Sequence, residues 1–141
     1  RDFARFHPGG ALGKQLYLRV SDLLHLHELP AVSPEATLRE VILEMTAKRL
    51  GATVVVSPDN EIVGIVTDGD LRRMLEQGDL PPHLNATEIM TPGPKSIDAE
   101  ALAVDALELM QSHKITQLPV TEHGKYTGMV HLHDLLREGL L

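Results

Sequence analysis

The sequence GIVTDGDL, at residues 64–71, returns as GMVHLHDL at residues 128–135. The offset is 64 residues, counted from Asp70 to Asp134. Apolar residues at helical spacing precede each copy: Leu38, Val41, Ile42 and Met45 before the first, and Ala103, Ala106, Leu107 and Met110 before the second. Still earlier, VSDLL at 20–24 resembles ATEIM at 86–90. Self-similarity at a fixed period is typical of repeated structural units, so we interpret the chain as two copies of one unit.

Both copies predict the same order of elements. In the first, Thr37 and Glu40 form a capping-box pair that begins a helix, and Gly51 is expected to end it. Helical and β-branched patterns there predict a helix at 37–49, strands at 53–57 and 61–67 around a turn at 58–60, and a helix at 68–77. The matching elements of the second copy are a helix at 103–113, strands at 117–121 and 126–131, and a last helix from His133. Short strands are expected at 31–33 and 95–97, with a linker at 78–85.

The size of each unit predicts how the two pack. A unit of about 60 residues buries only about 60% of its unfolded surface, whereas one near 150 residues buries nearly 70%. We therefore expect an α/β (α+β) fold in which two βαββα units pack sheet to sheet.

Composition narrows the functional classes. The 141 residues include no cysteine, so disulfides and thiolate metal sites are excluded. A formal net charge of -7, with no Trp, two Phe and two Tyr, argues against binding of nucleic acid. No apolar run reaches the roughly 20 residues of a membrane span, and no signal peptide is visible. We expect a cytoplasmic protein, and the start at Arg1 suggests a piece of a longer chain.

The duplicated pattern, with G-h-h-T-x-x-D between strand and helix, resembles a tandem pair of CBS domains. The resemblance implies pseudo-two-fold symmetry, with repeats at 20–80 and 81–141. The opening motif at residues 2–13, DFARFHPGGALG, resembles the end of the sugar isomerase (SIS) domain of bacterial arabinose 5-phosphate isomerases. The repeat endings TDGDLRR at 67–73 and HLHDLLR at 131–137 are similar to that family as well.

This second resemblance implies the regulatory tail of an isomerase. Residues 1–19 would then be the end of the SIS domain and a linker. The family interconverts ribulose 5-phosphate and arabinose 5-phosphate, which supplies the Kdo sugar of lipopolysaccharide. The expected partners are the missing SIS domain and a second copy of the pair, giving a tetramer for the full enzyme. His7 matches a family histidine suited to acid–base work, and we expect it to be inactive in this stretch alone.

CBS pairs in general hold a nucleotide at the T-x-x-D element, which corresponds to Thr67 and Asp70. Asp70 can accept both hydroxyls of a ribose, while Thr67 and the helix N-terminus can donate to a phosphate. Thr67 and Asp70 also have the spacing of a helix cap, and we expect a ligand site that caps the helix as well.

The second repeat departs from the pattern, because His131 replaces the threonine while Asp134 is kept. A histidine there would make the second half-site sensitive to pH near neutrality, so we expect the two half-sites to differ. The remaining predicted pocket residues are Val32, Ala52 and Thr53 for the first half-site, and Ile97, Thr116 and Gln117 for the second. The expected effector is an adenine nucleotide or a nucleotide sugar such as CMP-Kdo.

Other readings stay open. The histidine pairs at 25/27 and 131/133 lack a third ligand at fixed spacing, so we expect no metal and no cofactor. The pair of repeats could instead serve only to dimerise the enzyme, with no ligand. Catalysis by this stretch itself is not expected.

Overall fold

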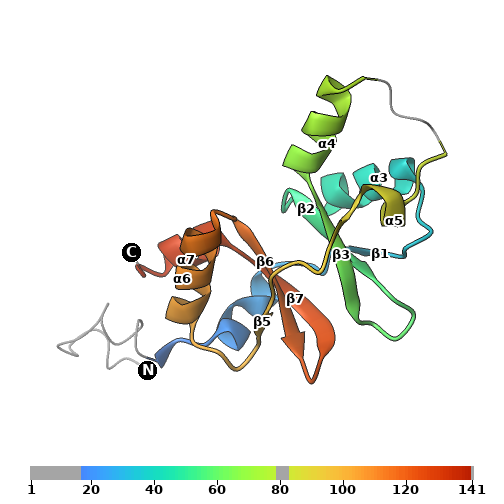
Figure 1. Cartoon of the computed structure of the whole chain (residues 1–141). Coiled ribbons are helices and arrows are strands. Elements are labelled where there is room, and N and C mark those ends of the chain that lie inside the picture. The colour runs from blue at the N-terminus through green and yellow to red at the C-terminus, as the bar shows by residue number, and fades with distance from the viewer. Residues whose placement is uncertain (1–16, 79–82, 141) are drawn as a thin grey trace.

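The computed structural model describes residues 17–78 and 83–140, which form two sheets, each with its own helices (Figure 1). The first repeat contains η1 (Val20–Leu26), β1 (Ala31–Val32), α3 (Leu38–Lys48), β2 (Ala52–Val56), β3 (Ile62–Thr67) and α4 (Asp68–Glu76). The second contains α5 (Ala86–Ile89), β4 (Thr91–Pro92), β5 (Ile97–Asp98), α6 (Ala103–His113), β6 (Gln117–Glu122), β7 (Lys125–His131) and α7 (Leu132–Arg137). The predicted α/β fold of paired repeats is confirmed.

The two sheets have related topologies. One has the strand order β1-β2-β3-β4 and the other β5-β6-β7. In each, a short first strand runs parallel to the second, and the second and third form an antiparallel hairpin. β4 comes from the second repeat in sequence but pairs with β3, at the edge of the first sheet. The sequence did not predict this strand.

Several predicted element ends differ from the structure by one or two residues. The helix α3 ends at Lys48, because Arg49 adopts a left-handed conformation (φ 60°) at its C-cap, so Gly51 is not its terminator. Gly51 itself has φ 74° and lies in the turn into β2. The short strand expected at 95–97 lies at Ile97–Asp98, and α7 starts at Leu132 with His131 as its N-cap.

The first helix of each repeat packs in the hydrophobic core of the other repeat. Val20 and Leu23 of η1 belong to the core of the second sheet, together with Leu107, Leu118 and Leu135. Ala86 and Ile89 of α5 belong to the core of the first sheet, with buried residues that include Val41, Met45, Val55 and Val66. Backbone hydrogen bonds repeat the exchange: Val20 N donates to Ala101 O (2.9 Å) and Ala86 N donates to Ala36 O (2.8 Å). Each repeat is therefore completed by a segment of the other.

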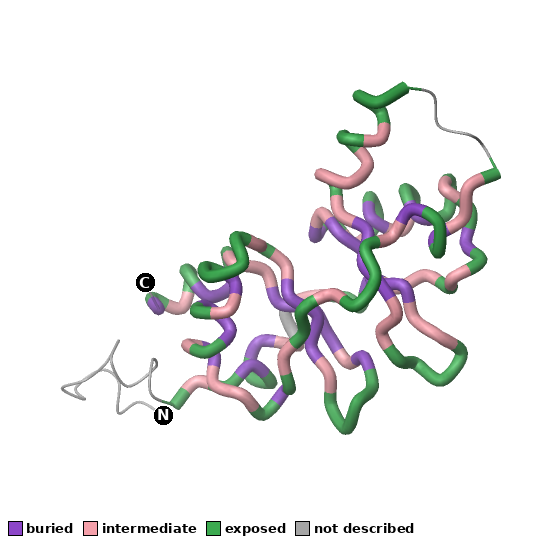
Figure 2. Tube along the Cα trace, in the orientation of Figure 1, coloured by how far each residue is buried: buried purple, intermediate pink, exposed green. Residues whose placement is uncertain are grey.

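A third buried cluster joins the sheets. It contains Leu50, Ala52, Val54 and Ile65 from the first repeat, and Tyr126 and Met129 from the second. The Tyr126 hydroxyl donates to Pro30 O (2.7 Å), and Asn60 Nδ2 donates to Tyr126 O (2.9 Å). Figure 2 shows buried residues along the strands of both sheets. The two sheets are consequently held together by buried side chains and hydrogen bonds from both repeats.

Candidate functional site

A cavity of about 420 Å³ lies where the first repeat meets the second. One side is formed at the β3–α4 junction, which carries Ile65, Thr67 and Asp70. The other side is formed by the second repeat, from β4 to the start of β6. Its lining residues there are Thr91, Gly93, Pro94, Lys95, His113, Ile115, Gln117 and Pro119. The first repeat therefore contributes mainly polar groups to the cavity, and the second repeat contributes both polar and apolar side chains.

Thr67 and Asp70 are bound to each other in this cavity. Thr67 N donates to Asp70 Oδ2 (2.9 Å), and Asp70 N donates to Thr67 Oγ1 (3.1 Å), which is a complete capping box on α4. Arg73 Nη2 donates to Asp70 Oδ1 (2.7 Å). A carboxylate offers about four acceptor positions, so the two bonds leave capacity for a ligand's hydroxyls. The Asp70 side chain is 17% exposed and lines the cavity. Capping and ligand contact are thus compatible in the same two residues.

Lys95 supplies a cation on the opposite wall. It follows Pro94 in the segment between β4 and β5 and is exposed. Within residues 17–78 and 83–140, the Lys95 ammonium has no hydrogen-bond or ion-pair partner. His113, at the end of α6, lies on the same wall, with Nδ1 3.1 Å from Leu109 O. An anionic group bound beside Thr67 would therefore face a cation. Sequence reasoning missed Lys95 and His113; the only local signal was the turn-forming Pro-Gly-Pro before Lys95.

Gln117 connects the two repeats beside the cavity. Its side-chain Nε2 donates to Leu50 O (3.0 Å), 67 residues away. The sequence assigned Gln117 to the second half-site, but its side chain lines the cavity of Thr67 and Asp70. A Cβ on Gly51 would lie 3.0 Å from Gln117 Nε2 and 3.2 Å from Asp68 Oδ2, so Gly51 occupies a narrow space between them.

The other predicted pocket residues lie elsewhere. Val32 lines a separate hollow of about 280 Å³ beside Ser33 and Pro58. Ala52 and Thr53 are fully buried in β2. Ile97 is half-buried in β5, and Thr116 is exposed before β6. Val32, Ala52 and Thr53, which were predicted for the first half-site, therefore do not line the cavity of Thr67 and Asp70. The placement of Ile97 and Thr116 in the second half-site stays a prediction. His7 lies outside the described residues.

The second half-site has the same capping position but a different environment. His131 N donates to Asp134 Oδ2 (2.8 Å), and His133 N donates to His131 Nδ1 (3.1 Å). Burial lowers the pKa of His131, and the neighbouring His133 lowers it further. The Asp134 side chain is only 1% exposed, and His27 Nε2 lies 2.8 Å from its Oδ2 and 2.9 Å from its Oδ1. The two aspartates therefore differ in burial and in the groups that contact them, while a difference in ligand binding stays a prediction.

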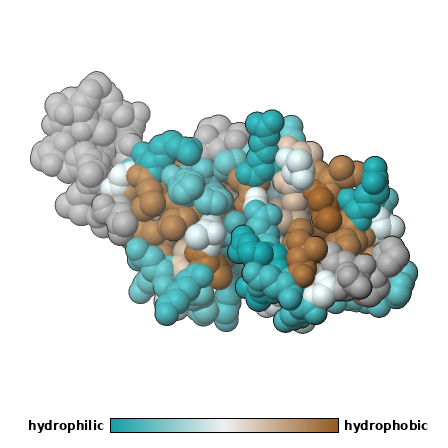
Figure 3. Space-filling view, turned by 90° about the horizontal axis from the view of Figure 1, so that it is seen from above, coloured by the Kyte–Doolittle hydropathy of each residue, from teal (hydrophilic) through white to brown (hydrophobic). Residues whose placement is uncertain are grey.

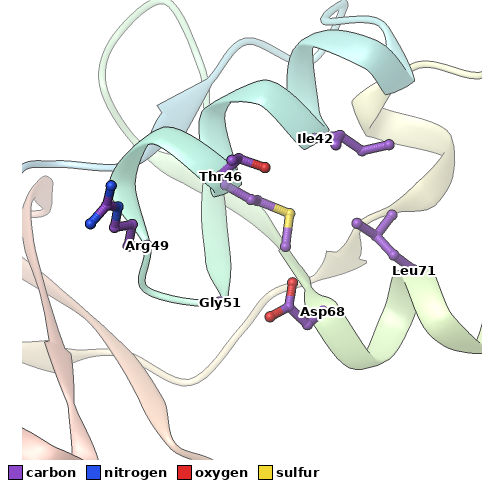
Figure 4. A pocket seen from close by; sticks show the side chains of 7 residues that line it. Ile42, Thr46, Arg49, Gly51, Asp68 and Leu71 are labelled. Carbon is purple, nitrogen blue, oxygen red and sulfur yellow. The ribbon is translucent and has the colours of Figure 1, made fainter.

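A further hollow of about 290 Å³ lies between α3 and α4 (Figure 4). Ile42 and Leu71 form its apolar side, and the Asp68 carboxylate lies near Gly51. No group of three or more His, Cys, Asp or Glu side chains among the described residues could hold a metal ion. In the same part of the chain, every helix is too short or too polar to span a bilayer.

Comparisons with known proteins show the family to which the chain belongs. A family model described as CBS domain matches residues 20–77 and 86–140. The arabinose 5-phosphate isomerase KdsD of Salmonella typhi is 50% identical, and that of Escherichia coli K12 is 47% identical, each over 99% of this chain. The chain spans 43% of the length of these relatives. A CBS domain protein of Pyrobaculum aerophilum, solved in complex with AMP, superposes with a TM-score of 0.76 at 27% identity, covering 84% of this chain and 90% of that one.

Proposed function

Because this chain belongs to the CBS domain family and carries a tandem pair, we propose that it is the regulatory module of an arabinose 5-phosphate isomerase. In this proposal the cavity at Thr67 and Asp70 binds a nucleotide or a nucleotide sugar such as CMP-Kdo. The remaining length of the relatives, beyond the 43% that this chain spans, would supply the catalytic SIS domain. The whole protein would convert ribulose 5-phosphate to arabinose 5-phosphate in the cytoplasm, with His7 at its sugar-phosphate site.

The observation that carries the proposal is that Thr67, Asp70 and Lys95 all line one cavity. A carboxylate suits the vicinal hydroxyls of a ribose, and an unpaired ammonium suits a phosphate. Ile65, Ile115 and Pro119 give an apolar wall for a base. Ligand pockets commonly measure 300–1,000 Å³, so about 420 Å³ fits a single nucleotide. The AMP complex of the Pyrobaculum protein supports the same ligand class.

The energetics are sufficient for a metabolite sensor. A hydrogen bond to a charged group contributes about 1.5–3 kcal/mol, and micromolar affinity needs only about −8 kcal/mol in total. A ligand that spans the two repeats would fix their relative orientation. A coupling of about 1–3 kcal/mol to the catalytic domain would change substrate affinity about 5–150-fold.

A melting-temperature screen tests the proposal. AMP, ATP and CMP-Kdo are added separately at millimolar concentration, with ribose 5-phosphate as the control that lacks a base. A ligand at 100 times its Kd stabilises by about 2.7 kcal/mol, which corresponds to a rise of about 5–10 °C for a domain of this size. If none of the three raises the melting temperature above the ribose 5-phosphate control, ligand sensing is wrong.

A second candidate function is dimerisation of the enzyme. Large apolar side chains are exposed on several helices: Ile42 (40%) and Leu43 (55%) on α3, Leu75 (64%) on α4 and Leu136 (38%) on α7. Figure 3 shows apolar patches on the face seen from above. We propose that a second copy covers exposed apolar side chains of this kind, Leu75 among them. Sedimentation velocity should give a dimer that Leu75→Glu dissociates, and a wild-type monomer at all concentrations would contradict it.

A further inference from the structure

The two half-sites differ in what their aspartates contact. Asp70 and Asp134 occupy the same capping-box position, 64 residues apart, and each accepts the backbone N–H of its own N-cap residue. Asp70 lines an open cavity and its side chain is 17% exposed, whereas that of Asp134 is 1% exposed. A group must therefore cover the side chain of Asp134, and no equivalent group among the described residues covers Asp70.

His27 is the covering group. It follows η1 directly, and its Nε2 lies 2.9 Å from Asp134 Oδ1 and 2.8 Å from Oδ2, across 107 residues of sequence. The His27 side chain is itself only 22% exposed. Its Nε2–H donates to the carboxylate whether the ring is neutral in that tautomer or protonated, and in the protonated form the contact is an ion pair. The contact is therefore a hydrogen bond in each form that carries a proton on Nε2.

The repeat shows which residue His27 replaces. This part of the repeat has an offset of 66 residues, as VSDLL at 20–24 and ATEIM at 86–90 show, so the counterpart of His27 is Gly93, which lines the open cavity beside Thr67 and Asp70. A glycine at that position has no side chain that could contact the first aspartate. A histidine at the related position reaches the second aspartate and binds both of its oxygens. The difference between the half-sites thus follows from one side chain.

Asp134 has little remaining acceptor capacity. Oδ2 accepts the backbone N–H of His131 as well as His27, and Arg137 Nη1 lies 3.6 Å from Oδ1. A ribose that used this carboxylate would have to displace His27. Displacement would break a charge-assisted hydrogen bond and expose a buried carboxylate, which makes binding there unfavourable relative to the first half-site.

We propose that His27 is an internal occupant of the second half-site, so that each chain takes one nucleotide-type ligand, at Thr67 and Asp70. This inference rests on the proposed function for its ligand class. It adds a specificity-determining residue, His27, that limits the stoichiometry. It also links the end of η1, through His27, to the start of α7 in the second repeat.

The test is a set of calorimetric titrations with AMP, ATP and CMP-Kdo. The variants are His27→Thr, which replaces the imidazole by a shorter side chain, the double variant His27→Thr/Asp134→Asn, and Asp70→Ala. We expect one ligand per wild-type chain, removed by Asp70→Ala. His27→Thr should bind two, and the added Asp134→Asn should return the number to one. If His27→Thr does not fold, His27→Asn, which keeps a polar but shorter side chain, takes its place.

The outcomes separate the inference from the proposed function. One ligand in the wild type and still one in His27→Thr overturns the inference and leaves the function standing. Two ligands in the wild type also overturn it. No ligand in the wild type but one in His27→Thr, lost with Asp134→Asn, would disprove binding at Thr67 and support the role of His27. No binding by any of these proteins would overturn both.

Discussion

Gly64 of β3 lies directly against the side chain of Met90, the residue that ends α5. A Cβ at Gly64 would lie 2.6 Å from Met90 Cγ, which is closer than real carbon atoms approach. The second repeat has the same arrangement, with Gly128 of β7 against Leu24 of η1. The two glycines thus mark the places where the exchanged helices cross the sheets. Their function is close approach, not an unusual backbone conformation.

The first prediction concerns Gly64→Ala. The added methyl group overlaps Met90 and must displace α5 from the first core, so we expect a loss of about 1–3 kcal/mol in the free energy of unfolding. Gly69→Ala is the control, because its Cβ would lie 3.4 Å from the flexible Arg73 guanidinium and would favour the helix. Urea unfolding compares the two. Equal stabilities for both variants and the wild type would contradict the account of the exchanged helices.

Lys95→Ala tests the anion-binding wall. We expect about a tenfold loss of affinity for AMP, equivalent to about 1.4 kcal/mol, with no change for adenosine, because only the phosphate contact is removed. Lys125→Ala is the matched control. Lys125 is half-exposed (48%), pairs with Glu61 at 3.5 Å and does not line the cavity. A loss for AMP that is the same in both variants would indicate general electrostatics instead of a phosphate contact.

Tyr126 should make stability depend on alkaline pH. Burial raises its pKa, and the negative charge of Glu44 raises it further. Because the protonated phenol is favoured in the folded state, this stability is fully present below the unfolded pKa of about 10 and is lost as pH rises above it. In a Tyr17→Phe background, which leaves Tyr126 as the sole tyrosine, phenolate absorbance should appear only with unfolding. Ionisation near pH 10 with the fold intact would contradict this prediction.

The same hydroxyl supports the contact between the sheets. Tyr126→Phe removes its bond to Pro30 O, and we expect a loss of about 1 kcal/mol in the free energy of unfolding. It should also remove the alkaline dependence above pH 10, which urea unfolding at several pH values would measure. An unchanged dependence in Tyr126→Phe would assign it to another group.

Most helices and strands could be predicted from the sequence, because each hydrophobic pattern occurs in both repeats. Leu38 to Met45 and Ala103 to Met110 give the same apolar helix face, and both helices are present. The strand β4 could not be predicted from the sequence, because it has only two residues, one of them Pro92, and so shows no alternating pattern. A proline is tolerated there because β4 is an edge strand. The exchange of η1 and α5 is equally non-local, because each helix packs in the core of the other sheet.

The candidate site could be predicted only in part. Thr67 and Asp70 are three residues apart, so their position at a helix start followed from local pattern. Lys95 and Gln117 reach the same cavity from the other repeat, and their placement depends on how the sheets pack. His27 and Asp134 meet across 107 residues, with no spacing rule to connect them. Local sequence periodicity does not predict which side chains meet when the two repeats pack together.

The most direct measurement is a calorimetric titration of Thr67→Val and Thr37→Val with AMP, ATP and CMP-Kdo. Both threonines cap a helix through the same capping box, but only Thr67 lines the cavity. Each substitution removes a cap worth about 1 kcal/mol, so the effects on stability should be alike. The account predicts that Thr67→Val weakens binding at least tenfold while Thr37→Val binds as the wild type does. Equal binding by both variants would contradict it, and Thr67 and Asp70 would then be a helix cap alone.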